Sequence, residues 1–124
     1  MAIVLHHHPF SRAANIVWML EEIGEPYELE LVRFTTGEHK TPAFLAKNPM
    51  GKLPTIEHRG IVVTEGAAII AYLADTFPDA GLAPPTGSPE RGRWYRWLFF
   101  GAGCVEPALV DKGFQRPPVE HTAS

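Results

Sequence analysis

Hydrophobic and polar positions follow two different periods along the first 78 residues, and each change of period marks an expected element. An apolar run at 2–6 predicts a buried strand. Apolar positions at helical spacing over 16–23 predict a helix that ends at Gly24. Regular alternation over 27–34 then predicts a second strand with one face partly exposed.

The rest of this region predicts a short helix, a hairpin and a longer helix. The segment 41–47 carries proline at its second position, which a first helical turn tolerates. Two short apolar runs, 53–57 and 61–64, form a hairpin pattern, and the wide apolar stripe over 67–77 predicts the last helix. This order predicts an α/β domain over residues 1–78, with one parallel strand pair, an antiparallel hairpin and covering helices.

A Pro- and Gly-rich stretch at 79–87 predicts a linker to a second region. Ser88-Pro89-Glu90 is typical of a helix start, with Ser88 as the expected cap. An apolar stripe rich in aromatic residues follows over 94–105, and Pro107 is expected to kink or end the helix. Because one helix cannot bury its own apolar face, we expect residues 88–124 to be part of an incomplete all-α domain.

Composition narrows the class of protein. The 124 residues are 45% hydrophobic and 20% charged, which fits a folded globular chain. A net charge of −3 gives no basic footprint for nucleic acid, and no apolar run approaches the roughly 20 residues of a membrane helix. The N-terminal sequence lacks a signal-peptide pattern. Because Cys104 is the single cysteine, the chain has no internal disulfide and no dithiol centre. We expect its side chain to be buried. The absence of disulfides suits a reducing compartment, so we expect a cytoplasmic protein.

Three stretches carry a resemblance to a known family. They are residues 11–28, the motif Asn-Pro-Met-Gly-Lys-Leu-Pro-Thr at 48–55, and Val-Thr-Glu-Gly-Ala-Ala-Ile-Ile-Ala-Tyr-Leu at 63–73. In order and spacing they resemble the glutathione transferases, in their bacterial cytosolic branch. The resemblance implies a thioredoxin-like βαβ-αββα domain, and residues 88–112 resemble the first helix of the family's helical domain. We expect a truncated chain, since on the order of 90 further residues would complete that domain.

The resemblance also implies an activity. This activity is the conjugation of the thiolate of reduced glutathione, the co-substrate, to hydrophobic electrophilic small molecules. Peroxide reduction is a further reaction. The resemblance also implies that the protein is a homodimer and acts in detoxification. No metal, nucleic acid or membrane partner is implied. The alternative is a non-catalytic module of the same family that binds partners. The missing co-substrate pocket wall and a glycine at position 66 favour this alternative modestly.

The resemblance implies that two pairs of residues bind glutathione. In the family, the proline before the third strand forms a cis peptide bond, and the residue before it presents its backbone to the ligand; these positions are Pro54 and Leu53. If the resemblance is set aside, the alternative is an ordinary trans proline at the start of a strand. Glu65 and Gly66 match the turn that holds the γ-glutamyl end, with Gly66 replacing the family's serine. The alternative is that Thr64 caps the helix and Glu65 complements its dipole.

Ser11 is the implied catalytic residue, because it matches the serine position of theta-like and related bacterial members. Its hydroxyl would stabilise the thiolate of glutathione, and a simple helix-capping role is an equal alternative. This loop has no Tyr or Cys, which argues against the tyrosine classes and against a cysteine-type mechanism. Lys40 and Lys52 are candidates to bind the glycyl carboxylate, against the alternative of solvated surface lysines.

Three consecutive histidines, His6, His7 and His8, raise the question of a metal site. In a strand, His6 and His8 share a side. Two histidines without a third ligand in reach are weak support, so we expect no metal.

Overall fold

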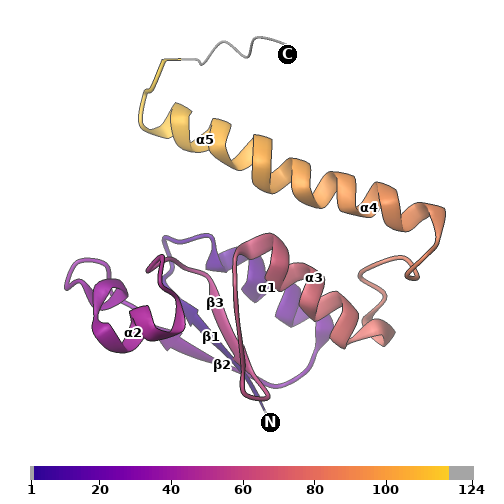
Figure 1. The fold of residues 1–124 in the computed structure, drawn as a ribbon, viewed down its shortest axis with the longest axis horizontal. Coiled ribbons are helices and arrows are strands. Elements are labelled where there is room, and N and C mark those ends of the chain that lie inside the picture. The colour runs from indigo at the N-terminus through magenta and orange to yellow at the C-terminus, as the bar shows by residue number, and fades with distance from the viewer. Residues whose placement is uncertain (1, 118–124) are drawn as a thin grey trace. The chain divides into compact units, whose positions relative to one another are not determined.

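The computed structural model describes residues 2–117, and this part of the chain divides after Ala83 into two compact units. Figure 1 shows the elements. Those of the first unit are β1 (Ile3–His7), α1 (Ala13–Ile23), β2 (Tyr27–Leu31), η1 (Glu38–Lys40), α2 (Pro42–Lys47), β3 (Thr55–His58), β4 (Ile61–Thr64), α3 (Gly66–Thr76) and η2 (Pro78–Ala80).

A four-stranded mixed sheet in the order β2-β1-β3-β4 forms the centre of the first unit. The central strand β1 runs parallel to β2, with Ile3 opposite Tyr27, and antiparallel to β3, with Leu5 opposite Ile56. The strands β3 and β4 form an antiparallel hairpin. This confirms the mixed sheet and the thioredoxin-like element order expected from the sequence.

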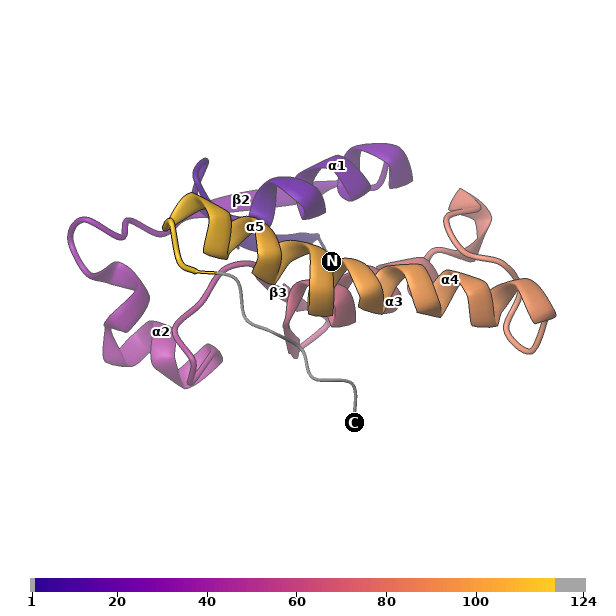
Figure 2. The same ribbon diagram turned by 90° about the horizontal axis from the view of Figure 1, so that it is seen from above.

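The helices α1 and α3 cover one face of the sheet and bury the main core between them (Figures 1 and 2). Strand alternation turns the apolar side chains of β1 and β3 toward this face. The helix α1 ends where its pattern predicts, at Gly24, whose φ of 80° is a left-handed conformation that glycine adopts without a steric penalty. The fully buried core comprises Ile3, Leu5, Ile16, Leu20, Ile56, Ile69 and Leu73.

The short helix α2 lies on the opposite face of the sheet. It begins as the sequence predicts, because the Thr41 hydroxyl accepts the N–H of Phe44 and Pro42 occupies the first turn. The Phe44 side chain is buried, and its ring centre lies 5.7 Å from that of His6 in an edge-on contact. His6 therefore points away from the α1/α3 core and toward α2.

Two strands differ in extent from the sequence expectation. The second strand ends at Leu31, three residues early, because the backbone of Arg33 bonds to Glu38 instead of to β1. The Arg33 N–H donates to the Glu38 carboxylate, and the Arg33 carbonyl accepts the Glu38 N–H at 3.0 Å. The third strand begins at Thr55, two residues late; Pro54, directly before it, has no N–H to give to a ladder.

The second unit is one continuous helical rod (Figure 2). It consists of α4 (Pro89–Phe100), a π-helical segment η3 (Gly101–Val105) and α5 (Glu106–Gly113). Of the two outcomes expected at Pro107, a kink or an end of the helix, the end is wrong. The wider π turn directly precedes this proline, where its missing N–H interrupts the regular bonding, and the helix then continues to Gly113. No helix within residues 2–117 is long and apolar enough to cross a membrane.

Two further expectations for this unit are wrong. Ser88 does not cap α4, because its hydroxyl donates to the Pro85 carbonyl at 2.7 Å. Cys104 is exposed, since the rod has no second layer of its own to cover it. The polar anchor near the start of α4 is Arg91, whose guanidinium lies 4.6 Å from the centre of the Trp94 ring.

A buried histidine gives the first unit a pH-dependent stability. The Nδ1 of His58 lies 2.7 Å from the Tyr72 hydroxyl of α3, and the residue is 3% exposed. Burial, assisted by the charge of Arg59, lowers the pKa of His58 below its ordinary value of 6.5. As the pH falls below about 6.5, the unfolded chain gains a proton here that the folded chain does not bind, so stability decreases.

We therefore expect His58→Asn to flatten the fall in unfolding free energy between pH 6.5 and the lower folded pKa, by up to about 1.4 kcal/mol per pH unit. Urea unfolding at a series of pH values measures this slope. His7→Asn, in the neighbouring strand β1, is the matched control. Equal slopes for His58→Asn and the unmodified protein would show that His58 does not carry the effect.

Candidate functional site

The loops that hold the site residues predicted from the sequence lie at one end of the sheet. The register sets His6 of β1 opposite Thr55 of β3, and Thr55 opposite Thr64 of β4. The end of β1, the start of β3 and the end of β4 therefore lie side by side, and the loops joined to them meet there. The predicted residues in these loops are Ser11, Leu53, Pro54, Glu65 and Gly66.

Ser11 is half-buried in the β1–α1 loop, and its hydroxyl is engaged locally. The Oγ donates to the His8 carbonyl at 2.7 Å and accepts the N–H of Ala13, at the start of α1, at 3.2 Å. The N-cap residue of α1 is Arg12, and no side chain caps this helix, so the capping alternative for Ser11 is wrong; its hydroxyl instead bonds within the loop directly before the helix. A hydrogen bond from Ser11 to a ligand requires its O–H to rotate away from the His8 carbonyl.

The Leu53–Pro54 peptide bond is cis. Pro54 is buried, whereas Leu53 is half-buried. Neither the N–H nor the C=O of Leu53 forms a hydrogen bond with any residue between 2 and 117. Leu53 therefore offers one free backbone donor and one free acceptor at the end of the sheet.

Asn48, which the sequence analysis did not single out, holds the loop before Leu53 in place. Its side chain is buried; Nδ2 donates to the Lys52 carbonyl at 2.9 Å and to Thr55 Oγ1 at 3.1 Å. Its Oδ1 accepts the Met50 N–H at 3.0 Å. The available sequence signal is the Asn-Pro pair of the motif, since asparagine often bonds to the backbone of its own turn.

The two predicted lysines differ in their surroundings. Both lysines are exposed, but the Nζ of Lys40 donates to the Met50 carbonyl at 3.0 Å. Gly51 fits closely there: its φ is 60°, and a Cβ would lie 2.7 Å from both the His39 carbonyl oxygen and Lys40 Nζ. The Nδ1 of His39 is buried without a hydrogen-bond partner, a feature that sequence reasoning missed.

Aromatic rings connect the loop of Ser11 with the loop after β2. The rings of His8 and Phe34 have centres 5.0 Å apart, and those of Phe34 and His39 are also 5.0 Å apart. Phe10 lies 5.7 Å from His8 and is almost fully exposed. Phe34 thus holds two segments together that are far apart in the sequence.

Glu65 has a backbone conformation that residues other than glycine rarely adopt. Its φ is 75° and its ψ is 121°, and its side chain is exposed. Such strain in a non-glycine residue tends to occur at ligand-binding positions. The helix α3 begins at Gly66 without a side-chain cap, so the capping alternative for Thr64 is wrong. The uncapped first turn presents N–H groups that favour an anion.

Comparison with known proteins relates this arrangement to one family. A family model described as "Glutathione S-transferase, N-terminal domain" matches residues 1–75. Glutathione S-transferase 3 of Schizosaccharomyces pombe is 32% identical over 107 residues, which are 86% of this chain and 44% of that protein. Human glutathione S-transferase theta-2 is 34% identical over 95 residues, 77% of this chain and 38% of the relative.

Solved structures give the same result. A glutathione transferase homolog from Lodderomyces elongisporus, with two GSH per subunit, has a TM-score of 0.85 at 28% identity and covers 90% of this chain and 55% of its own. A family member from Pseudomonas fluorescens, with two glutathione bound, has a TM-score of 0.81 at 34% identity, covering 91% and 51%. The chain spans less than half the length of the two relatives matched by sequence. With a thioredoxin-like unit followed by one long helix, and a family match over most of its length, the chain belongs to the glutathione S-transferase family.

Proposed function

We propose that this chain binds reduced glutathione at the sheet end formed by the loops of Ser11, Leu53 and Glu65. The observation that carries the proposal is that two sets of unused binding groups lie at this end of the sheet. The strained Glu65 and the uncapped start of α3 lie next to β4, and the free backbone of Leu53 lies next to β3. The two solved structures compared above contain bound glutathione, which supports the same ligand here.

Each end of glutathione has a chemically suitable partner. The cysteinyl backbone can pair with Leu53 as with a strand edge. The Glu65 carboxylate suits the γ-glutamyl ammonium, and the N–H groups of the first turn of α3, beginning at Gly66, suit the adjacent carboxylate. Lys40 and Lys52 supply positive charge for the glycyl carboxylate. Gly66 provides no hydroxyl, so this end relies on backbone N–H groups alone.

The proposed reaction of the whole protein is transfer of the glutathione thiolate to a hydrophobic electrophilic small molecule, with peroxide reduction as a further reaction. A free thiol has a pKa of about 8.5, so a hydrogen bond to the thiolate increases the reactive fraction near neutral pH. Ser11 is the proposed donor, because its hydroxyl lies at the start of α1. A cytoplasmic, detoxifying homodimer is part of the proposal.

A second function, binding of glutathione without catalysis, is favoured by one observation. The Ser11 proton is already given to the His8 carbonyl at 2.7 Å. In this arrangement the hydroxyl does not stabilise a thiolate. The two functions differ in whether glutathione binding is accompanied by a lowered thiol pKa.

Ser11→Ala separates the two functions. We expect it to raise the thiol pKa of bound glutathione toward the free value and to lower the conjugation rate about 10- to 100-fold, because hydrogen bonds to charged groups contribute roughly 1.5–3 kcal/mol. Thiolate absorbance against pH and turnover of a generic electrophile by the full-length protein measure this. Ser11→Thr, which keeps the hydroxyl, is the matched control and should retain most of the rate.

The hydrogen bonds of Ser11 to His8 and Ala13 predict a separate effect, a stability loss of about 1 kcal/mol in Ser11→Ala, which thermal unfolding measures. Normal conjugation by Ser11→Ala would contradict the role proposed for this residue. Glutathione binding with neither conjugation nor a lowered thiol pKa in the unmodified protein would support the non-catalytic function.

A further inference from the structure

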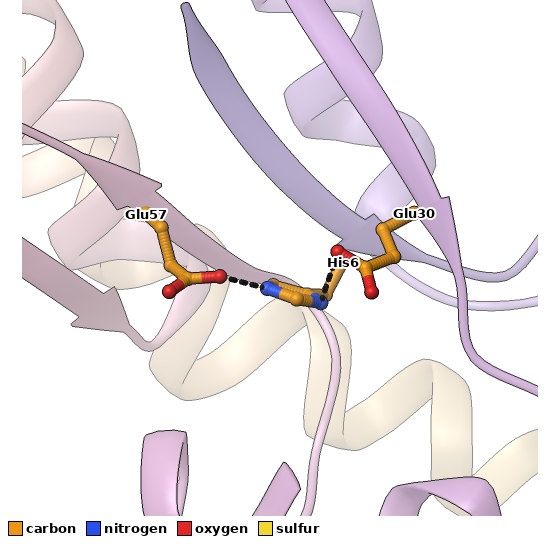
Figure 3. Close-up of side chains that lie close together, drawn as sticks. All are labelled: His6, Glu30 and Glu57. Atoms are coloured by element: carbon orange, nitrogen blue, oxygen red, sulfur yellow. Dashed lines mark hydrogen bonds and ion pairs between the residues drawn. The ribbon is translucent and has the colours of Figure 1, made fainter. Parts of the chain in front are cut away.

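A second cluster of polar side chains lies on the sheet face that α2 covers. Alternation along β1 turns His6 to this face, opposite to the core residue Leu5. The register sets Glu30 of β2 directly opposite His6, and Glu57 of β3 opposite Val4, one diagonal step from His6. Three strands therefore bring one imidazole and two carboxylates together (Figure 3).

The imidazole lies between the two carboxylates. The Nε2 of His6 is 2.6 Å from Glu57 Oε2, and its Nδ1 is 3.8 Å from Glu30 Oε2 (Figure 3). His6 is 2% exposed, and the edge contact with Phe44 restricts its ring. One ligand atom from each of the three residues lies within 4.8 Å of the others.

Bonds of about 2.0–2.2 Å in a tetrahedral site place ligand atoms roughly 3.3 Å apart. A metal ion binds only one nitrogen of His6, and Nε2 and Nδ1 face different carboxylates. Binding through Nε2 therefore requires Glu57 to open its hydrogen bond to His6 and the Glu30 side chain to move toward Nε2. The Glu30 side chain is 61% exposed and is free to supply such a movement. His6, the buried member, provides the fixed point of the site.

A cavity of about 240 Å³ adjoins the cluster. Its lining includes His6, Glu30, Glu38 and Lys47. The Glu30 and Glu38 carboxylates and the Lys47 ammonium are the charged groups of this lining, and the Glu38 carboxylate is paired with Arg33. The cavity also has room for water to complete the coordination of a metal.

Lys47 competes for the same position. Its Nζ lies 3.0 Å from Glu57 Oε2, the same oxygen that lies 2.6 Å from His6 Nε2. A metal at this site has to displace the Lys47 ammonium and bind His6 through a deprotonated nitrogen.

We propose that His6, Glu30 and Glu57 form a binding site for a divalent transition metal of the zinc type, open to the cavity beneath α2. Imidazole and carboxylate ligands suit this class of ion. The site lies on the other face of the sheet from the α1/α3 core, uses none of the residues proposed to bind glutathione, and does not depend on that proposal.

Titration calorimetry with zinc chloride tests the site on the whole chain, without an affinity tag. We expect saturable binding of one zinc per chain. Glu30→Gln and Glu57→Gln should each weaken binding at least tenfold. Lys47→Met should strengthen binding, because it removes the competing ammonium, and this gain cannot arise from a loss of folding.

Two controls identify the site. Glu28→Gln removes a carboxylate from the same strand, outside the cluster, and should leave zinc binding unchanged. Melting curves of each variant without zinc show whether it is folded. The proposal is overturned if the unmodified chain shows no saturable zinc binding, if folded Glu30→Gln and Glu57→Gln bind zinc normally, or if Lys47→Met fails to strengthen binding.

Discussion

Replacing Glu65 by glutamine is expected to raise the dissociation constant for reduced glutathione by about 10- to 100-fold. The change keeps the size of the side chain and one oxygen acceptor, but it removes the charge proposed to meet the γ-glutamyl ammonium. A hydrogen bond with a charged partner contributes roughly 1.5–3 kcal/mol, and 1.4 kcal/mol corresponds to about tenfold in affinity. Titration calorimetry with glutathione measures the change.

Glu25→Gln is the matched control, because Glu25 is also exposed and lies in the turn before β2, at the other end of the sheet. It should bind glutathione like the unmodified chain. Gly66→Ser is the opposite change: a Cβ at Gly66 meets nothing within 4 Å, so the added hydroxyl fits and should tighten binding. A dissociation constant for Glu65→Gln equal to that of the unmodified chain would refute the role of Glu65.

Asn48→Ala is expected to destabilise the first unit by about 2–5 kcal/mol. The substitution removes the bonds to Lys52, Thr55 and Met50 and leaves the Met50 N–H and the Lys52 carbonyl with fewer partners in a partly buried loop. For a domain of this size, such a loss lowers the melting temperature by roughly 10–20 °C or more. Because this loop carries Leu53, we also expect weaker glutathione binding at temperatures where the variant is folded.

Thermal unfolding followed by circular dichroism measures the loss. Asn15→Ala, an exposed position on α1, should change stability by no more than about 0.5 kcal/mol. If Asn48→Ala and Asn15→Ala melt alike, the network around Asn48 does not hold the loop.

The order of elements could be predicted from the sequence because each element carries its own periodic pattern. The alternation in β2 and the stripe in α3 depend only on neighbours along the chain, and both elements are present in the structure. The errors occur where a single side chain competes with the pattern. The Glu38 carboxylate ends β2 by bonding to Arg33, and the Ser88 hydroxyl bonds to Pro85 instead of to its helix.

The site was only partly predictable for a different reason. Residues within the family motifs, such as Leu53 and Glu65, could be named by position. Asn48 and His39 matter through buried contacts of their side chains, which no local pattern reveals. The cluster around His6 depends on the register of three strands, and register becomes visible only when the sheet is formed.

Amide chemical shifts of the labelled protein during titration with reduced glutathione test the proposed binding site most directly. The proposal predicts saturable shifts for Leu53 and for Gly66, with little change for Arg59 and Gly60 in the hairpin turn at the other end of β3 and β4. Shifts that are absent at millimolar glutathione, or confined to residues away from these loops, would contradict it.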